Sequence, residues 1–275
     1  MVGANPLGSL MRTWNAPGVD PQERAAIAVV IPTILRPSLA RALESVFAQE
    51  FAGRVQILIG IDKPAGTMEL LESTCALAPS HCCVQLLYPG YSTSVRHGGP
   101  WAARDGGTLR TILSYLANAP LIAYLDDDNW WGLRHLDSLA RAIDPVDWAF
   151  SLRWFVHPDT AHPVCVDQWE SVGPDAGIFR ERFGGFVDPN CLMIKREPCA
   201  AALPLWTIPL PGDEKAMSAD RTVFNFLSRE RKFATSGAAT CFYVVDPTDG
   251  LHPLRLQAMG TRYQEAGADV GGGAI

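Results

Sequence analysis

A short apolar block that runs straight into three aspartates constrains the fold of this chain more than any other feature. Residues 121–125, Leu-Ile-Ala-Tyr-Leu, have the apolar character of a strand buried on both faces of a parallel sheet. Asp126, Asp127 and Asp128 follow at its C-terminal end, where open α/β sheets bind their ligands. Adjacent carboxylates repel one another and are costly to bury alone. The run is therefore either a solvated acidic turn or the site of a bound cation.

Strands and helices alternate through the first half of the chain. Apolar runs predict buried strands at 26–31, 55–62, 82–88 and 121–125. Residues 36–51 and 108–118 repeat apolar positions at helical spacing, so each segment predicts an amphipathic helix. We expect Pro32 to end the first strand, because proline cannot donate to a ladder. The alternation predicts right-handed βαβ units in a doubly wound, nucleotide-binding α/β layout.

The second half of the chain has longer connections between its elements. Strand-like and helical segments are predicted at 147–157, 190–197, 218–230 and 239–246. The Pro-rich connection at 203–215 is long for a compact domain, and loops of that length usually carry function. The glycine-rich end at 265–275 predicts a loose tail.

Composition limits the classes of protein that this chain can be. It has 275 residues, of which 48% are hydrophobic and 19% charged, enough for one large α/β domain. A net charge of −6 provides no general basic field for nucleic acid. Seven cysteines without a CxxC pair fit a reducing cytosol better than a disulfide framework or a zinc site. No signal peptide or membrane span is evident, so we predict a cytoplasmic protein, with peripheral attachment to the inner face of the membrane left open.

Four segments, in this order, resemble the family 2 glycosyltransferases of the GT-A fold. They lie at 29–49, 59–62, 102–131 and 218–227, within a resemblance that covers 26–246. The resemblance implies a Rossmann-like, mixed but mainly parallel sheet flanked by helices. It implies an enzyme that moves a sugar from a nucleoside-diphosphate sugar to an acceptor hydroxyl, with inversion and with a metal ion. A UDP-sugar is the favoured donor and a GDP-sugar the alternative, while the acceptor is a carbohydrate, a lipid-linked molecule or a small molecule.

The same resemblance divides the chain into four parts. Residues 1–25 form an N-terminal extension, 26–131 the nucleotide-sugar-binding half, 132–250 the acceptor-binding half of the same domain, and 251–275 a C-terminal tail.

The aspartate run resembles the DxD motif, which in this family holds the donor diphosphate through a divalent cation. The resemblance implies that Asp128 binds the metal directly, that Asp126 shares the metal or faces the nucleoside, and that Asp127 has the least determined donor contact. Carboxylate oxygens suit Mn²⁺ or Mg²⁺, which would neutralise charge on the leaving diphosphate. His252, after the last strand, is a further candidate ligand. Alternatively, Asp128 or Asn129 caps a helix expected over 130–143.

Five more positions resemble the donor site of the family. Pro32, Thr33 and Arg36 match the donor-binding loop after the first strand. Asp62 matches the acid that accepts a hydrogen bond from the base, and Arg104 matches a position near the phosphates, where a guanidinium suits a diphosphate. The alternatives are strand termination for Pro32, a turn for Asp62 and a surface side chain for Arg104.

The family places its general base in an acidic pair ahead of a helix, and Asp220 lies at that position. Here the usual Glu-Asp pair is Ala-Asp, so one carboxylate is missing. Asp213 and Glu214 are reserve candidates, and Asp220 could instead cap its helix. Indole faces stack on sugar rings, and we expect Trp206, from its loop setting, to shape the acceptor pocket.

Two other functions compete with this interpretation. A sugar-nucleotide nucleotidyltransferase would carry a glycine-rich phosphate loop after its first strand, whereas residues 32–38 contain no glycine. A non-catalytic nucleotide-sugar-binding partner protein is consistent with the missing carboxylate. A turnover assay that detects donor hydrolysis distinguishes the binding protein from an enzyme.

Overall fold

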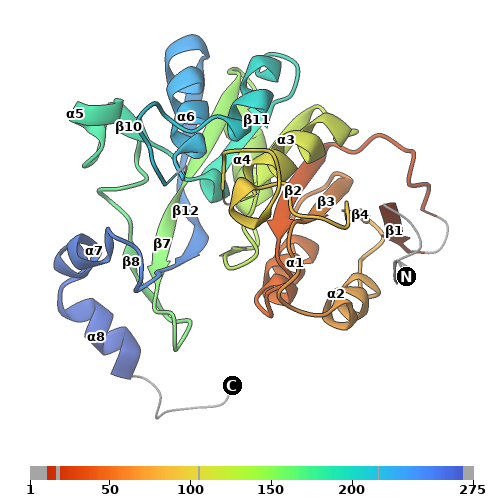
Figure 1. The fold of residues 1–275 in the computed structure, drawn as a ribbon, viewed down its shortest axis with the longest axis horizontal. Coiled ribbons are helices and arrows are strands. Elements are labelled where there is room, and N and C mark those ends of the chain that lie inside the picture. Colours follow the sequence, from red (N-terminus) through yellow and green to blue (C-terminus); the bar gives the residue numbers. More distant parts are fainter. Residues whose placement is uncertain (1–10, 17–18, 105, 216, 269–275) are drawn as a thin grey trace.

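The structure is a computed structural model that describes residues 11–16, 19–104, 106–215 and 217–268. One mixed sheet of ten strands forms its centre (Figure 1). The strands of this sheet are β1 (Met11–Asn15), β2 (Ile27–Thr33), β3 (Val55–Ile61), β4 (Cys82–Leu87), β5 (Leu121–Tyr124), β6 (Trp130–Trp131), β7 (Trp148–Val156), β8 (Pro163–Val166), β11 (Leu192–Lys195) and β12 (Phe233–Val244). A separate two-stranded sheet pairs β9 (Gly173–Pro174) with β10 (Gly185–Phe186).

The α-helices pack against this sheet and against one another. They are α1 (Leu39–Phe47), α2 (Met68–Cys75), α3 (Gly107–Leu116), α4 (His135–Ile143), α5 (Arg180–Phe183), α6 (Ala219–Glu230), α7 (His252–Met259) and α8 (Thr261–Ala268). Short 3₁₀ helices are η1 (Val95–His97), η2 (Pro189–Cys191) and η3 (Ala200–Thr207). Helix α3 packs on β2 and β3, whereas α4 packs on β7 and β12. Figure 1 shows α7 and α8 on the opposite side of the molecule from β1.

The order of strands separates a parallel region from a mixed one. The order is β1-β4-β3-β2-β5-β11-β7-β12-β6, with β8 paired to β7. Strands β4, β3, β2 and β5 are parallel neighbours, and every residue of β2 and β3 is buried. Beyond β5 the pairing alternates, because β11 is antiparallel to both β5 and β7 while β12 is parallel to β7. This mixed but mainly parallel sheet in the first half confirms the predicted fold class.

The first strand continues through Pro32, although proline was expected to end it. The Val30 carbonyl accepts a hydrogen bond from Leu125, so the backbone of Val30 and, two residues on, of Pro32 faces the β5 side. Strand β5 ends at Tyr124, which pairs with Val30. The missing N–H of Pro32 therefore lies beyond the neighbouring strand and removes no ladder hydrogen bond.

Two further segments differ from the sequence prediction. Trp130 and Trp131 form β6 and pair with Phe242 and Cys241, so the helix expected from 130 begins only at His135. Residues of the predicted tail form α7 and α8, because the buried Arg255 anchors α7 through ion pairs to Glu170 and Asp249. The rest of the predicted tail, 269–275, and the first ten residues of the predicted extension lie outside the described residues.

Apolar side chains fill both faces of the parallel strands. The larger core joins β2, β3, β5 and β11 to the inner faces of α1 and α4. A small second cluster contains Phe155, Val245 and Met259 under α7. All seven cysteines are buried and unpaired. Within the part of the chain that the structure describes, no helix has the length and apolar character needed to cross a bilayer.

Candidate functional site

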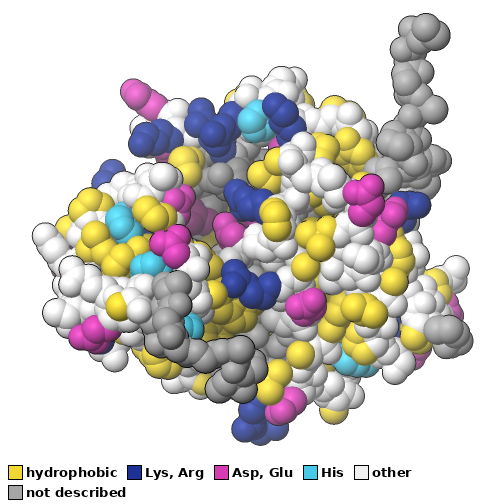
Figure 2. Space-filling view, turned by 90° about the horizontal axis from the view of Figure 1, so that it is seen from below, with side chains coloured by type: hydrophobic (Ala, Val, Ile, Leu, Met, Phe, Trp, Pro, Cys, Tyr) yellow, Lys and Arg dark blue, Asp and Glu magenta, His cyan; other side chains and the backbone are white. Residues whose placement is uncertain are grey.

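The aspartate run lies at the carboxyl ends of the parallel strands. Tyr124 of β5 is level with Val30 of β2, and Thr33 at the end of β2 is level with Ile61 of β3. The segments that follow these three strands therefore emerge at one edge of the sheet. In Figure 2 the molecule is seen from below the view of Figure 1, and acidic and basic side chains gather around a hollow on that face. The register thus brings together the predicted positions 33, 36, 62 and 126–128.

Asp127 holds the loop that follows β2. Its buried carboxylate accepts hydrogen bonds from Thr33 Oγ1 at 2.7 Å and Ile34 N at 3.3 Å, and it pairs with Arg36 Nη1 at 2.7 Å. All these partners belong to the loop after β2, so the Asp127 carboxylate holds this loop in shape and positions Arg36.

The backbone of this loop is strained at Leu35. Leu35 has a φ of 64°, in the left-handed region that glycine favours, and its side chain is buried. Thr33 Oγ1 accepts the Leu35 N–H at 2.8 Å, so the hydroxyl that donates to Asp127 also holds the strained residue. The loop that presents Arg36 is thus fixed from two sides.

Asp128 is the most accessible carboxylate of the run. Its side chain is 47% exposed and pairs with Arg36 Nη1 at 3.1 Å. Partial burial, together with the charges of Asp126 and Asp127, raises the pKa of Asp128 to about 7. Arg41 lies near enough to feel the charge of Asp128, and its guanidinium sits 3.8 Å from the ring centre of Trp130. A bound cation would relieve the excess negative charge at this position.

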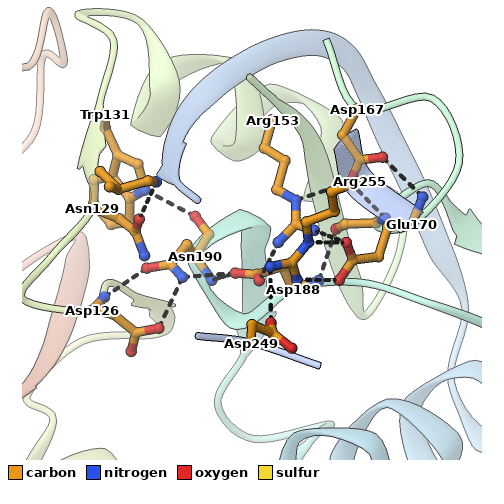
Figure 3. A network of polar contacts seen from close by, with 12 residues as sticks. Asp126, Asn129, Trp131, Arg153, Asp167, Glu170, Asp188, Asn190, Asp249 and Arg255 are labelled. Atoms are coloured by element: carbon orange, nitrogen blue, oxygen red, sulfur yellow. Dashed lines mark hydrogen bonds and ion pairs between the residues drawn. The ribbon is translucent and has the colours of Figure 1, made fainter. Parts of the chain in front are cut away.

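Asp126 is held by two residues that the sequence analysis did not identify. Arg110 of α3 forms an ion pair with Asp126 Oδ1. Asn190 donates to Asp126 Oδ2 at 2.9 Å, as Figure 3 shows. Each carboxylate oxygen accepts up to two hydrogen bonds, so Asp126 keeps lone pairs for another ligand. Arg110 falls inside a segment that resembles the family. In the sequence, however, it looked like an ordinary polar position of an amphipathic helix. Asn190 begins a strand-like run and gave no signal.

Asp62 follows β3 and contacts the loop after β4, and Arg104 lies further along that loop. The buried Asp62 carboxylate accepts from Ser92 Oγ at 2.9 Å, from Thr93 N at 2.6 Å and from Thr93 Oγ1 at 3.0 Å. It therefore fixes this loop and keeps acceptor capacity on Oδ2. Arg104 is half-buried, and its Nε has no hydrogen-bond partner among the described residues.

Asp220 lies in the first turn of α6, near enough to Arg110, a partner of Asp126, for that charge to act on it. Its Oδ1 accepts the N–H of Arg221 at 2.7 Å. Burial raises the pKa of Asp220 to about 6, with Arg221 opposing the shift, and the charges of Asp188 and Arg110 also act on it. Ser218 occupies the cap position of the helix, so Asp220 does not serve as the N-cap residue.

The reserve candidates are committed elsewhere. Asp213 accepts N–H groups of Lys215, Met217 and Ser218 in its own loop, and a hydrogen bond from the Ser218 side chain does most to lower its pKa. Glu214 is exposed. Neither shows a described contact to the residues that hold the aspartate run.

The expectation that Trp206 shapes an acceptor pocket is wrong. Trp206 is 1% exposed and lies in η3, where it packs 4.8 Å from Tyr124 and 5.3 Å from the guanidinium of Arg110. What looked like an open loop in the sequence is a 3₁₀ helix, and the apolar core takes up the indole. The Trp206 ring packs against the guanidinium of Arg110 and is not available to a ligand.

The carboxylates of Asp126 and Asp128 suit a cation that takes its remaining ligands from water or from a substrate. The described residues contain no group of three or more His, Cys, Asp and Glu side chains that could hold a metal ion. His252 therefore does not complete a three-ligand set with Asp126 and Asp128, and its ring packs 5.8 Å from Tyr263. Mg²⁺ and similar ions commonly use one or two carboxylates, with water and substrate phosphates as the remaining ligands.

Comparison with known proteins supports the fold. No protein-family model matches the chain, and no curated protein matches it by sequence. Residues 1–349 of TarS from S. aureus, in complex with UDP, align at a TM-score of 0.54 and 17% identity, covering 85% of this chain and 64% of that chain. The UDP-GlcNAc complex aligns at 0.53 and 14% identity, covering 82% and 60%.

The mannosyltransferase PcManGT from Pyrobaculum calidifontis, in complex with GDP-Man and Mn²⁺, aligns at a TM-score of 0.52. It has 17% identity, and the alignment covers 95% of this chain and 69% of that chain. The chain thus spans less than two thirds of the length of these two TarS chains. Similarity at these identities establishes the GT-A fold and leaves activity to be argued from the site.

Proposed function

We propose that this protein is a glycosyltransferase that moves a sugar from a nucleoside-diphosphate sugar to an acceptor hydroxyl. The observation that carries the proposal is the aspartate run at the carboxyl end of β5, with Arg36 and Arg110 paired to it. A UDP-sugar is the favoured donor and a GDP-sugar the alternative, in line with the ligands of the proteins that share the fold. The acceptor class, a cytoplasmic location and the division into two functional halves stay predictions.

The loop after β2 and the loop after β4 would bind the donor. Arg36 and Arg104 offer guanidinium groups to the diphosphate, and Thr33 keeps the first loop in shape. Asp62 has an acceptor oxygen left for a base N–H. Pro32 lies next to Thr33 near the end of β2 and leaves no backbone N–H there to compete with the ligand.

Asp128 and Asp126 would hold Mn²⁺ or Mg²⁺ together with oxygens of the diphosphate. When bound, such an ion neutralises the negative charge that develops on the leaving nucleoside diphosphate. Arg36, paired with Asp128, and Arg110, paired with Asp126, limit the repulsion between the two carboxylates before ligands arrive. Asp127 stays with the loop and contributes indirectly.

Asp220 is our candidate for the general base of an inverting transfer. It is half-buried, it is the only acid of the three candidates with charged neighbours from the aspartate site, and its raised pKa suits proton uptake near neutral pH. It would accept the proton of the acceptor hydroxyl as that oxygen attacks the anomeric carbon.

Donor binding is tested by thermal denaturation with UDP or GDP, in Mn²⁺ and in chelator. A ligand at 100 times its Kd stabilises the native state by about 2.7 kcal/mol. Asp128→Ala should remove the Mn²⁺-dependent part of that stabilisation, while Asp137→Ala, an acid on α4 paired with Arg141, should retain it. Equal nucleotide binding in chelator and in Mn²⁺ would contradict the metal-linked site.

Catalysis is tested by Asp220→Asn, with Asp213→Asn as the matched control. If Asp220 is the base, kcat should fall by about 10² to 10⁴ while donor affinity stays the same. Turnover near the unmodified level would remove Asp220 from the mechanism. Absence of donor hydrolysis and of transfer in the unmodified protein would favour a binding protein, and a product with retained anomeric configuration would exclude inversion.

A further inference from the structure

Asn190 links the aspartate site to a group of buried charges. We define the buried charge cluster as Arg153, Asp167, Glu170, Asp188 and Arg255. Figure 3 shows these side chains on one side of Asn190 and Asp126 on the other. Asn190 itself is fully buried in η2, between β10 and β11. Asn190 is therefore placed so that the buried charge cluster can hold Asp126 in a fixed position.

The amide of Asn190 is used from both ends. Its Oδ1 accepts the backbone N–H of Asp126 at 2.6 Å, while its Nδ2 donates to Asp126 Oδ2 at 2.9 Å and to Asp188 Oδ1 at 2.7 Å. A flipped amide would point its oxygen at two carboxylates, so only one orientation satisfies all three contacts. An amide suits this position, because a carboxylate would repel both acids and an apolar side chain would remove all three contacts.

The backbone of Asn190 is held without any help from Asp126. Its N–H donates to Asp188 Oδ1 at 2.9 Å, and its carbonyl accepts from Trp131 Nε1 at 2.9 Å. Trp131 belongs to β6, so Asn190 is fixed to both the η2 turn and the edge of the sheet. The side chain therefore reaches Asp126 from a rigid base.

The buried charge cluster fixes Asp188 in turn. Arg153 has no exposed surface and pairs with Asp188 Oδ2 at 2.5 Å, with Asp167 Oδ2 at 2.9 Å and with Glu170 Oε2 at 3.1 Å. Arg255 pairs with the same Glu170 through both Nε and Nη2, each at 2.9 Å. Asp188 is therefore held by a cation that is itself fixed by two further carboxylates, and moving Asp188 away would leave its own charge unpaired in a dry environment.

From this geometry we infer that Asn190 is a positioning residue, which aims the free lone pairs of Asp126 at the cation that carries the donor diphosphate. The inference rests on the proposed function and deepens it. Asp126 is the end of a chain of contacts that runs through Asn190 and Asp188 to Arg153. The outer groups that orient metal ligands typically change metal affinity by about 10- to 100-fold when they are removed.

The test measures, in the full chain, how UDP or GDP binding and how turnover depend on the Mn²⁺ concentration. Asn190→Ala should raise the Mn²⁺ concentration needed for half-maximal effect by about 10- to 100-fold. Asp249→Asn is the matched control, since Asp249 pairs with Arg255 at the far end and does not contact Asp126. It should leave the Mn²⁺ dependence unchanged. Asn190→Ser, which keeps a small polar side chain, serves if the alanine variant does not fold.

The outcomes separate this inference from the function on which it rests. If the unmodified protein shows no Mn²⁺-linked nucleotide binding, the proposed function fails and the inference falls with it. If the unmodified protein shows such binding and a folded Asn190 variant has the same Mn²⁺ dependence, only the positioning role is overturned. Equal weakening in Asp249→Asn would also overturn it, because general loosening of the cluster would then explain the effect.

Discussion

Two regions of this molecule are equally shielded from water but are built from opposite chemistry. In the parallel region, β2 and β3 are apolar along almost their whole length and are packed on both faces. In the mixed region, β7 carries Arg153 into the interior, where three carboxylates from two other segments surround it. The first region depends on the area of apolar surface removed from water, and the second depends on each charge having its partner.

The difference predicts how each region responds to substitution. Burial of apolar surface is non-directional, so trimming one side chain removes a limited amount of stabilisation. The stability of a buried ion pair depends on both partners, since removal of one leaves the other charged and unsolvated. The contact between the two regions is made at Asp126, which follows a parallel strand and is held by Asn190 from the mixed region.

Loss of Arg153 should have the largest effect on stability. Arg153→Met keeps the length of the side chain but leaves Asp167, Glu170 and Asp188 without their shared cation, and we expect a loss of about 3–5 kcal/mol in the free energy of unfolding. Urea denaturation at neutral pH measures it. A loss below about 1 kcal/mol would show that the carboxylates find other partners, and the contrast between the regions would disappear.

Acid should weaken the mixed region through His135. This residue is fully buried against Trp131, with its Nδ1 2.8 Å from Thr240 Oγ1, and burial lowers its pKa to about 3. In the unfolded chain this histidine takes up a proton near pH 6.5. The contribution of His135 to the free energy of unfolding is therefore complete above that pH. Between pH 6.5 and 3 it falls by about 1.4 kcal/mol per pH unit.

The measurement for His135 is the pH dependence of unfolding in the unmodified protein and in His135→Gln. The substitution removes the titrating group, so the difference between the two curves isolates it from the carboxylates. Parallel curves from pH 6.5 to 4.5 would show that His135 is protonated in the folded protein.

The parallel region should respond more mildly. Ile57 of β3 has no exposed surface, and Ile57→Val removes one methylene from the apolar core. We expect a loss of about 0.5–1.5 kcal/mol, measured in the same urea experiment as Arg153→Met. A loss as large as that of the charged residue would mean that packing in this region is as exacting as ion pairing in the other.

The smallest effect is expected for an ion pair on the surface. Arg141 pairs with Asp137 at 3.0 Å on α4, but its side chain is 73% exposed. Arg141→Ala should change the free energy of unfolding by no more than about 0.5 kcal/mol, and the change should shrink further in high salt. A larger, salt-independent effect would indicate that exposure does not separate this ion pair from those of Arg153.

The same contrast explains which parts of the fold could be predicted from the sequence. Uniform apolar runs announce strands that are buried on both faces, so the parallel strands and the acids at their ends were predicted and found. Arg153, in contrast, stands in a run that reads as an ordinary strand, and its partners come from residues 14, 17 and 35 positions further along the chain. Periodicity reports on local structure and gives no information about such pairings.

The candidate site divides in the same way. Asp128, Arg36 and Asp62 follow predicted strands, and the structure brings them to one edge of the sheet. Asn190 could not be found, because a single asparagine gains its meaning only when β11 is laid beside β5. Trp206 was misplaced because a proline-containing 3₁₀ helix has no periodic signature to distinguish it from a loop.

The left-handed leucine in the loop after β2 has a consequence for the chain before it folds. A bulky residue at a φ of 64° costs on the order of 1–3 kcal/mol, so Leu35 adopts this shape only while its neighbours enforce it. Glycine would take the same shape freely, but the unfolded segment would then sample many more conformations and lose more entropy on folding. Leucine thus restricts the disorder of this loop in advance, and the folded loop carries the corresponding strain where Arg36 is presented.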